Sequence, residues 1–178
     1  MELVHDTFLG LPPEECSLEE SAVVLLRAPY DGTTSYSPGT REGPAAILAA
    51  SAQVEPYDLE LEREPCDVGI HTLPALLPPA ALGPEAVIDQ VEVLSREVLS
   101  AGKFPFLLGG EHSVTLGAAR AVAEAHPGVS FLQIDAHLDL RPSYEGSRFS
   151  HACVAFNLLG LPERGSLVQV GVRAACPE

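Results

Sequence analysis

Two short clusters of metal-capable side chains come directly after apolar runs in this sequence. Residues 104–108 (FPFLL) lead into GGEHS at 109–113, and residues 129–134 (VSFLQI) lead into DAHLD at 135–139. Residues at i, i+2 and i+4 of an extended segment share one side, so Asp135, His137 and Asp139 can point at one spot. Functional groups collect outside the carboxyl ends of parallel strands, so we expect His112 to face the same cavity. The sequence therefore predicts a metal site.

The types of these side chains indicate which metal and which reaction to expect. Carboxylates with imidazoles suit hard or borderline ions such as Mn²⁺, whereas soft metals need thiolates. Asp135 and Asp139 would repel each other at the end of an apolar strand without a cation between them. A carboxylate can bridge two ions, and a water held between ions about 3.5 to 4 Å apart loses a proton easily. The implied reaction is hydrolysis.

Other polar residues near these clusters have simpler expected roles. We expect Glu111 to be a charge favourable to a helix start rather than a chemical group, and Ser113 to be a helix cap. Arg41 and Arg148 are expected to hold loops or pair with acids, outside the catalytic set. For Asp31 and Tyr36, loop structure, an oligomer contact and substrate contact all stay open.

The elements that must position these clusters follow from hydrophobic periodicity. Helical spacing and capping signals predict helices over 44–51, 84–101, 113–126 and 151–159, with a proline-rich connection over 74–84. Apolar runs predict strands over 22–27, 67–70, 104–108, 129–134 and 167–172. Alternation of strands and helices predicts a three-layer α/β/α fold with a mostly parallel sheet, in which residues 1–178 form a single domain.

Composition narrows the classes of function. The 178 residues include 25 acidic and 10 basic side chains, for a net charge of −15, which disfavours nucleic-acid binding. No apolar stretch approaches the roughly 20 residues that span a bilayer, and no targeting segment is evident, so we expect a cytoplasmic protein without membrane contact. The four cysteines lack zinc or redox spacing and are expected to be free, mostly buried thiols. We do not expect Cys153 to act as a catalytic thiol.

Four motifs in this chain resemble those of one enzyme family. GGEHS (109–113) and DAHLDLR (135–141) look like the manganese signatures of the ureohydrolase family, which includes arginases and agmatinases. PYDGTTSY (29–36) and PGTREGP (38–44) resemble the N-terminal signature of agmatinases in particular, and YEGSRFSHA (144–152) resembles their substrate loop. The motifs stand in the family's order, and the similarity runs from about residue 22 to the end.

The resemblance implies an arginase-like fold and a specific role for each of the candidate site residues. His112, Asp135 and Asp139 would bind one Mn²⁺, while His137 and again Asp135 would bind the second. His151 would shuttle a proton to the departing amine, a role that suits an imidazole. The family reaction is attack of an activated water on a guanidinium carbon of a small cationic substrate, here agmatine, to give putrescine and urea. Guanidinobutyrate and related guanidino compounds stay open, and relatives suggest a homo-oligomer.

The sequence also departs from the family. The family takes two more manganese ligands from a later Asp-x-Asp motif and a substrate-binding acid from further on, and neither is found up to residue 178. We therefore expect the N-terminal portion of a longer agmatinase-like enzyme, with a fold incomplete at the C-terminus. A catalytically silent family member, acting as a metal-binding or oligomer-building subunit, is the alternative. A zinc-dependent amide hydrolase with a single ion is a third reading, which GGEH fits poorly.

Overall fold

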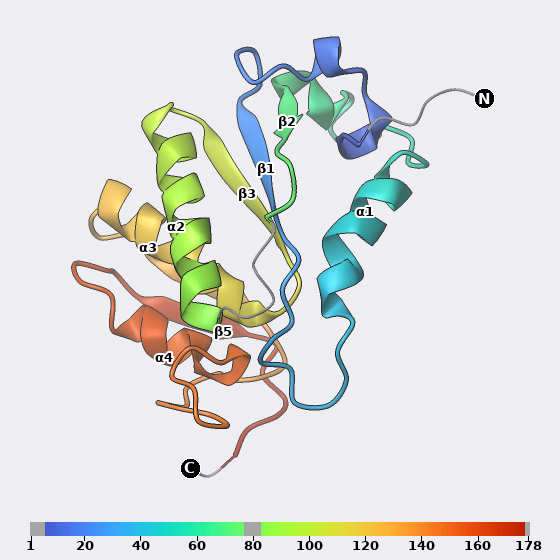
Figure 1. Cartoon of the computed structure of the whole chain (residues 1–178). Coiled ribbons are helices and arrows are strands. Elements are labelled where there is room, and N and C mark those ends of the chain that lie inside the picture. Colours follow the sequence, from blue (N-terminus) through green and yellow to red (C-terminus); the bar gives the residue numbers. More distant parts are fainter. Residues whose placement is uncertain (1–5, 77–82, 177–178) are drawn as a thin grey trace.

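Parallel strands flanked by helices make up the computed structural model, which describes residues 6–76 and 83–176 (Figure 1). The strands are β1 (Val23–Ala28), β2 (Ile70–Thr72), β3 (Phe104–Gly109), β4 (Phe131–Ile134) and β5 (Leu167–Val170). The longer helices are α1 (Gly43–Ser51), α2 (Pro84–Ser100), α3 (Thr115–Ala125) and α4 (Val154–Leu159). The strand–helix alternation and the parallel pairing agree with the predicted α/β class.

The strands form two sheets in the described part of the chain, where one was expected. The first has the order β2-β1-β3, and β1 pairs in parallel with both neighbours. The second consists of β4 and β5, also parallel, with Gln133 opposite Gln169 in its register. Each apolar run finds a hydrogen-bonding partner in this way, but β3 and β4 do not pair with each other. Both keep exposed apolar side chains, among them Phe104 and Ile134.

Helices cover both faces of the first sheet. In Figure 1, α2 and α3 lie side by side against one face, and α1 lies on the opposite side. The buried face of α2 follows helical periodicity, with Val87, Val91 and Val98 at most 7 % exposed. Gly117 of α3 allows the close approach of the two helices, since a Cβ there would lie 2.3 Å from the carbonyl oxygen of Ile88.

Several element boundaries differ from those predicted; β4 begins at Phe131 rather than at residue 129, and β5 ends at Val170 rather than at residue 172. The expected strand over 67–70 is wrong, because Pro65–Val68 form a 3₁₀ turn that ends at Gly69, whose φ is +74°, and β2 begins only at Ile70. The helices expected from Ser113 and His151 begin with 3₁₀ turns, His112–Val114 and His151–Cys153, before α3 and α4. Of the proline-rich connection over 74–84, residues 77–82 lie outside the described residues.

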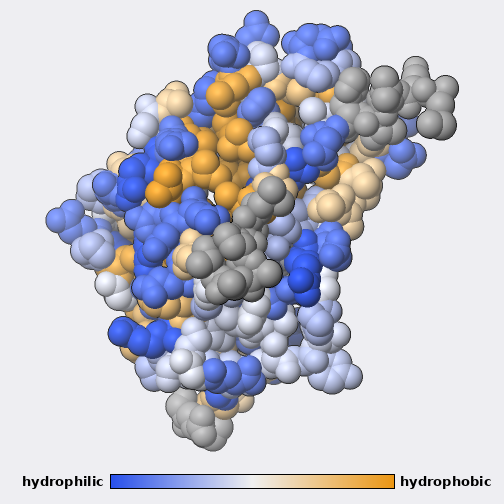
Figure 2. Space-filling view, in the orientation of Figure 1, coloured by the Kyte–Doolittle hydropathy of each residue, from blue (hydrophilic) through white to orange (hydrophobic). Residues whose placement is uncertain are grey.

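The surface is mixed in character. Figure 2 shows apolar side chains gathered between α2 and β2, over the strands of the first sheet, while the lower part of the same face is mostly polar. Within residues 6–76 and 83–176, no helix has the length and apolar character needed to cross a membrane. No disulfide joins the four cysteines. Cys16 and Cys153 are buried, whereas Cys66 is half-buried and Cys176 is exposed. The prediction of mostly buried thiols is therefore correct for only two of the four.

Candidate functional site

A pocket of about 750 Å³ opens at the carboxyl ends of β3 and β4. The segments that follow these strands line it, together with residues 34–37 from the loop after β1 and the start of the turn that precedes α4. The strand-end argument made from the sequence therefore holds. The pocket brings together all five residues predicted for the site: His112, Asp135, His137, Asp139 and His151.

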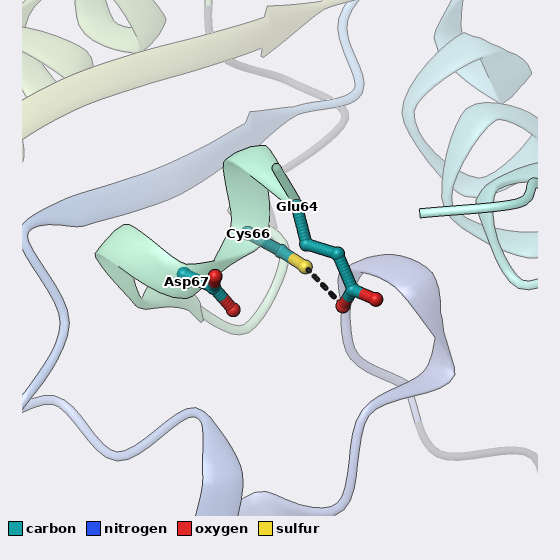
Figure 3. Close-up of side chains that lie close together, drawn as sticks. All are labelled: Glu64, Cys66 and Asp67. Carbon is teal, nitrogen blue, oxygen red and sulfur yellow. Dashed lines mark hydrogen bonds between the residues drawn. The ribbon is translucent and has the colours of Figure 1, made fainter. Parts of the chain in front are cut away.

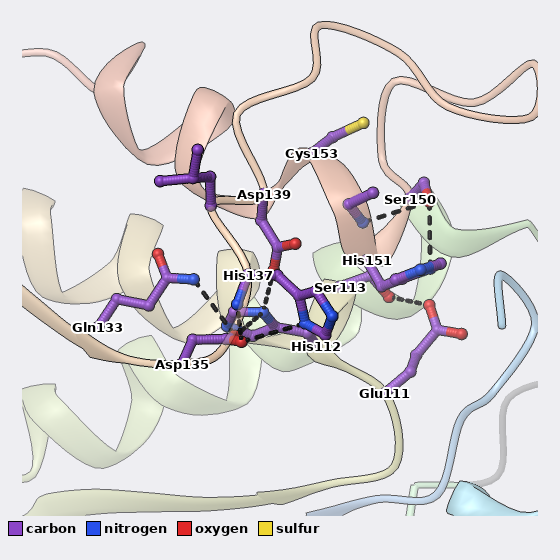
Figure 4. A network of polar contacts seen from close by, with 12 residues as sticks. Glu111, His112, Ser113, Gln133, Asp135, His137, Asp139, Ser150, His151 and Cys153 are labelled. Carbon is purple, nitrogen blue, oxygen red and sulfur yellow. Dashed lines mark hydrogen bonds and ion pairs between the residues drawn. The ribbon is translucent and has the colours of Figure 1, made fainter. Parts of the chain in front are cut away.

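Three potential metal ligands converge in this pocket (Figure 4). Nδ1 of His112 lies 2.7 Å from Oδ2 of Asp139 and 3.4 Å from Oδ2 of Asp135. One ligand atom from each of these side chains lies within 4.8 Å of the others. One imidazole and two carboxylates form a donor set suited to a divalent ion such as Mn²⁺. Asp139 reaches this position from a left-handed backbone conformation, with a φ of 49°.

His137 approaches Asp135 from the other side. Its Nδ1 lies 3.4 Å from Oδ1 of Asp135, and its backbone N–H donates to the same oxygen at 2.8 Å. The two oxygens of Asp135 thus face two different imidazoles, His112 and His137. The His137 side chain is 66 % exposed, so its ring is open to the pocket. This arrangement suits a carboxylate shared between two ions.

A pair of glutamines that the sequence analysis missed orients Asp135. Nε2 of Gln133 donates to Oδ2 of Asp135 at 3.3 Å. Nε2 of Gln169 donates both to Oε1 of Gln133, at 2.9 Å, and to the carbonyl oxygen of Leu138, at 2.7 Å. Burial raises the pKa of Asp135, but hydrogen bonds from His137 and Gln133 and the two imidazoles outweigh this and lower the pKa overall. The available signal was the position of Gln133, two residues before Asp135 on one strand.

Close backbone packing fixes the loop that carries His112. The N–H of Gly110 donates to the carbonyl oxygen of Ala28 at 3.0 Å, and that of Glu111 to the carbonyl oxygen of Tyr30 at 2.8 Å. A Cβ at Gly110 would lie 2.1 Å from this Tyr30 oxygen, so only glycine fits. The loop after β3 is therefore held directly against the loop after β1.

His151 lies at the start of the turn before α4. Ser150 caps this turn, since its Oγ accepts the N–H of Ala152. The ring of Tyr144 packs edge-on against that of His151, with 5.8 Å between ring centroids and an interplanar angle of 88°. Nδ1 of His151 lies 3.3 Å from the hydroxyls of both Thr33 and Ser150. These neighbours restrain the imidazole at the edge of the pocket.

Glu111 and Ser113 differ from their expected roles. Glu111 is 6 % exposed, and its carboxylate makes no capping hydrogen bond to the following turn. It accepts instead from the backbone N–H of Thr33, at 2.7 Å, and from the hydroxyls of Thr33 and Ser113. Ser113 is a donor to this carboxylate and not a cap. Thr33 lies 78 residues away along the chain, which is why local sequence patterns did not reveal the contact.

The loop after β1 is organised by one buried carboxylate. Oδ2 of Asp31 accepts from the N–H of Gly39 at 2.7 Å and from Nε of Arg41 at 3.0 Å. Burial raises the pKa of Asp31, but the Gly39 hydrogen bond and the Arg41 charge outweigh it, so the pKa is lowered. Asp31 and Arg41 therefore hold the loop, as one reading of the sequence expected. Tyr36 is fully exposed at the pocket.

Two cysteines near acidic groups are not suited to thiolate chemistry. Burial raises the pKa of the Cys153 thiol, and this side chain is fully buried. Figure 3 shows Cys66 in a second group of potential ligands, with Glu64 and Asp67, on the turn before β2. Burial and the Glu64 charge raise the pKa of the Cys66 thiol, which favours the protonated form. Neither Glu64 nor Asp67 lines the pocket.

Comparison with known proteins identifies the family. Residues 21–178 match the model of the arginase family. The chain is 45 % identical over 159 residues to N(1)-aminopropylagmatine ureohydrolase of Thermus thermophilus, covering 88 % of this chain and 52 % of the relative. It is 37 % identical over 163 residues to agmatinase of Bacillus anthracis, covering 91 % and 56 %. The structure of agmatine ureohydrolase of Thermoplasma volcanium superposes with a TM-score of 0.77 at 36 % identity, covering 89 % and 52 %. The chain spans about half the length of the curated relatives it matches, and it belongs to the arginase family.

Proposed function

We propose that this chain carries the metal-binding half of a manganese-dependent ureohydrolase site that releases urea and an amine from a linear guanidino compound. The observation that supports this most is the convergence of His112, Asp135 and Asp139 beside His137 in one pocket. Imidazole and carboxylate donors favour Mn²⁺ over soft metals. Membership of the arginase family agrees with hydrolysis as the reaction class.

The proposed ligands divide between two ions. His112, Asp135 and Asp139 would hold one Mn²⁺, and His137 with the second oxygen of Asp135 would hold the other. When bound, Mn²⁺ makes a nearby water a stronger nucleophile toward a guanidinium carbon. These side chains supply fewer ligands than two ions take up, so further donors from water or polypeptide complete the site.

His151 is the proposed proton carrier. It lines the same pocket as the metal ligands, and its ring is held between Tyr144 and the hydroxyls of Thr33 and Ser150. An imidazole titrates near neutral pH, so it can accept a proton and pass it to the departing amine. A net charge of −15 favours the approach of a small cationic substrate.

The proposed substrate is agmatine, with N(1)-aminopropylagmatine as the second candidate. Both activities appear among the named relatives. The chain is 45 % identical to the N(1)-aminopropylagmatine ureohydrolase and 37 % identical to the agmatinase, and this difference is the observation that favours the aminopropyl compound as a second candidate. The two substrates share the guanidinium group and differ in the length and charge of the remaining chain. We further propose that the protein works in the cytoplasm as a homo-oligomer.

Metal content and urea release measured on one sample test this proposal. The purified protein is loaded with Mn²⁺, desalted, and analysed for manganese per chain and for urea from each candidate substrate. We expect manganese retention, and urea release that depends on the metal and disappears in His137→Ala. His126→Ala removes an exposed histidine outside the pocket and should change neither readout. Urea formed without metal would contradict the proposal, and metal retention without urea would favour the silent, metal-binding alternative.

A further inference from the structure

The hydroxyl of Thr33 links a buried carboxylate to the imidazole of His151. Glu111 is almost fully buried and receives three protein donors: the backbone N–H of Thr33 and the hydroxyls of Thr33 and Ser113. A carboxylate has only acceptor sites to offer. The hydroxyl hydrogen of Thr33 is therefore committed to Glu111, and Oγ1 of Thr33 can only accept from any other neighbour.

Two N–H groups of His151 are the candidates to fill this acceptor. The backbone N–H of His151 donates to Oγ1 of Thr33 at 3.0 Å, and Nδ1 of the ring lies 3.3 Å from the same oxygen. An oxygen whose own hydrogen points elsewhere attracts Nδ1 only when that nitrogen carries a hydrogen. A bare Nδ1 would place two lone pairs against each other. Thr33 thus favours the tautomer with hydrogen on Nδ1.

Within the described part of the chain, Ser150 is the only other polar group at hydrogen-bond distance from Nδ1. Its Oγ lies 3.3 Å from Nδ1 and accepts the N–H of Ala152. The Ser150 hydroxyl can rotate to donate to Nδ1 or to accept from it, so it is compatible with either tautomer. The choice between tautomers therefore lies with Thr33, whose hydrogen Glu111 holds.

We propose that Thr33 and Glu111 are positioning residues that hold neutral His151 with its hydrogen on Nδ1, which leaves Nε2 as the nitrogen that exchanges protons in the pocket. Nε2 has no hydrogen-bond partner among the described residues, so its lone pair is available. The consequence for catalysis rests on the proposed function. Nε2 takes a proton released by the attacking water, and the departing nitrogen receives that proton together with the electron pair of the broken C–N bond. Nδ1 keeps its hydrogen throughout.

Nitrogen NMR of the imidazoles tests the tautomer without substrate or metal. The metal-free protein, labelled with ¹⁵N in histidine, is measured at about pH 8, where an ordinary imidazole is neutral. His151→Gln identifies the resonances of His151. We expect a protonated-type shift at Nδ1 and an unprotonated-type shift at Nε2. The opposite assignment in the wild-type protein would overturn the proposal, whatever the urea assay shows.

Matched variants separate positioning from mere packing. Thr33→Val removes the hydroxyl at nearly constant volume and should shift His151 toward the Nε2–H tautomer, whereas Thr33→Ser should restore the wild-type shifts. Ser150→Ala should leave the tautomer unchanged; if it reverses the tautomer and Thr33→Val does not, the assignment to Thr33 is wrong. If Thr33→Val fails to fold, Glu111→Gln decides, because an amide donor there releases the Thr33 hydroxyl to donate to Nδ1. Wild-type shifts in a folded Glu111→Gln protein would overturn the role of Glu111.

Discussion

Gly110→Ala should damage both the fold and the metal site, because there is no space for a side chain between two backbone segments. The new Cβ would lie 2.1 Å from the carbonyl oxygen of Tyr30, where ordinary contact begins at 3.4 Å, so the segments must separate by about 1.3 Å. This separation breaks the hydrogen bonds from Gly110 to Ala28, at the end of β1, and from Glu111 to Tyr30, just after it. Two such bonds contribute about 2 kcal/mol, and overpacking adds about 1 to 3 kcal/mol.

Urea unfolding followed by circular dichroism measures this loss, which we expect to total about 3 to 5 kcal/mol. Gly83→Ala is the matched control, since Gly83 has a φ of −66° and no atom of the described residues lies within 4 Å of the position that a Cβ would take. Because Gly83 is the N-cap of α2, where alanine is less favourable than glycine, the unfolding free energy of this control should change by no more than about 1 kcal/mol. Only Glu111 separates Gly110 from His112, so the proposed manganese binding should weaken by about tenfold or more in Gly110→Ala. A loss below about 1 kcal/mol with unchanged metal binding would refute the reasoning.

Four other changes have defined outcomes. Gly117→Ala forces a Cβ against the backbone of α2 and should lower the unfolding free energy by about 1 to 3 kcal/mol in the same assay. Ser95→Ala should be neutral or raise the melting temperature, because within the described residues this buried hydroxyl has no hydrogen-bond partner. Gln133→Leu should weaken manganese binding about 10-fold to 100-fold, measured by titration calorimetry, since it frees Asp135 to rotate. The pKa of Asp31 is lowered in the fold. The contribution of this carboxylate to stability is therefore present above the ordinary pKa of about 3.9 and is lost as the pH falls through the lowered pKa. Unfolding measured from pH 7 to 3 should show that Asp31→Asn is less stable than the wild-type protein at pH 7 and loses less stability on acidification.

Local patterns predicted the elements that depend on local physics. The period of α2 and its end shortly before Gly102, which has a φ of +71°, follow from residues within one or two turns of each other. The start of β2 was predicted too early, at residue 67. Pro65 begins a 3₁₀ turn and Gly69 ends it, so the residues before Ile70 are not part of the strand. The division into two sheets depends on which strand edges meet, and strand sequences alone do not encode this.

The convergence of the site residues could be predicted because the ends of two strands are recognisable in the sequence. The residues that orient them were harder to find, since their partners are distant along the chain. Gln169 reaches Gln133 only because β4 and β5 pair in one particular register. The hydroxyl of Thr33 meets His151 across 118 residues, and nothing in the local spacing of either residue indicates the contact. The role of Glu111 was predicted wrongly for the same reason. Its partner Thr33 lies in the loop after β1, and the residues next to Glu111 in the sequence do not indicate this contact.

His112 follows a strand of one sheet, whereas Asp135 and Asp139 follow a strand of the other. An ion held by all three would act as a cross-link between two bodies that share no strand pairing in the described residues. Ion binding and the docking of the sheets are then coupled equilibria, and free metal at 100 times its dissociation constant would add about 2.7 kcal/mol to the folded state. The coupling is reciprocal, so a substitution deep between α3 and α4, where the two sheets' helices pack together, would change metal affinity without touching a ligand. A measurement of affinity for the ion would therefore also report how completely the two sheets are docked against each other.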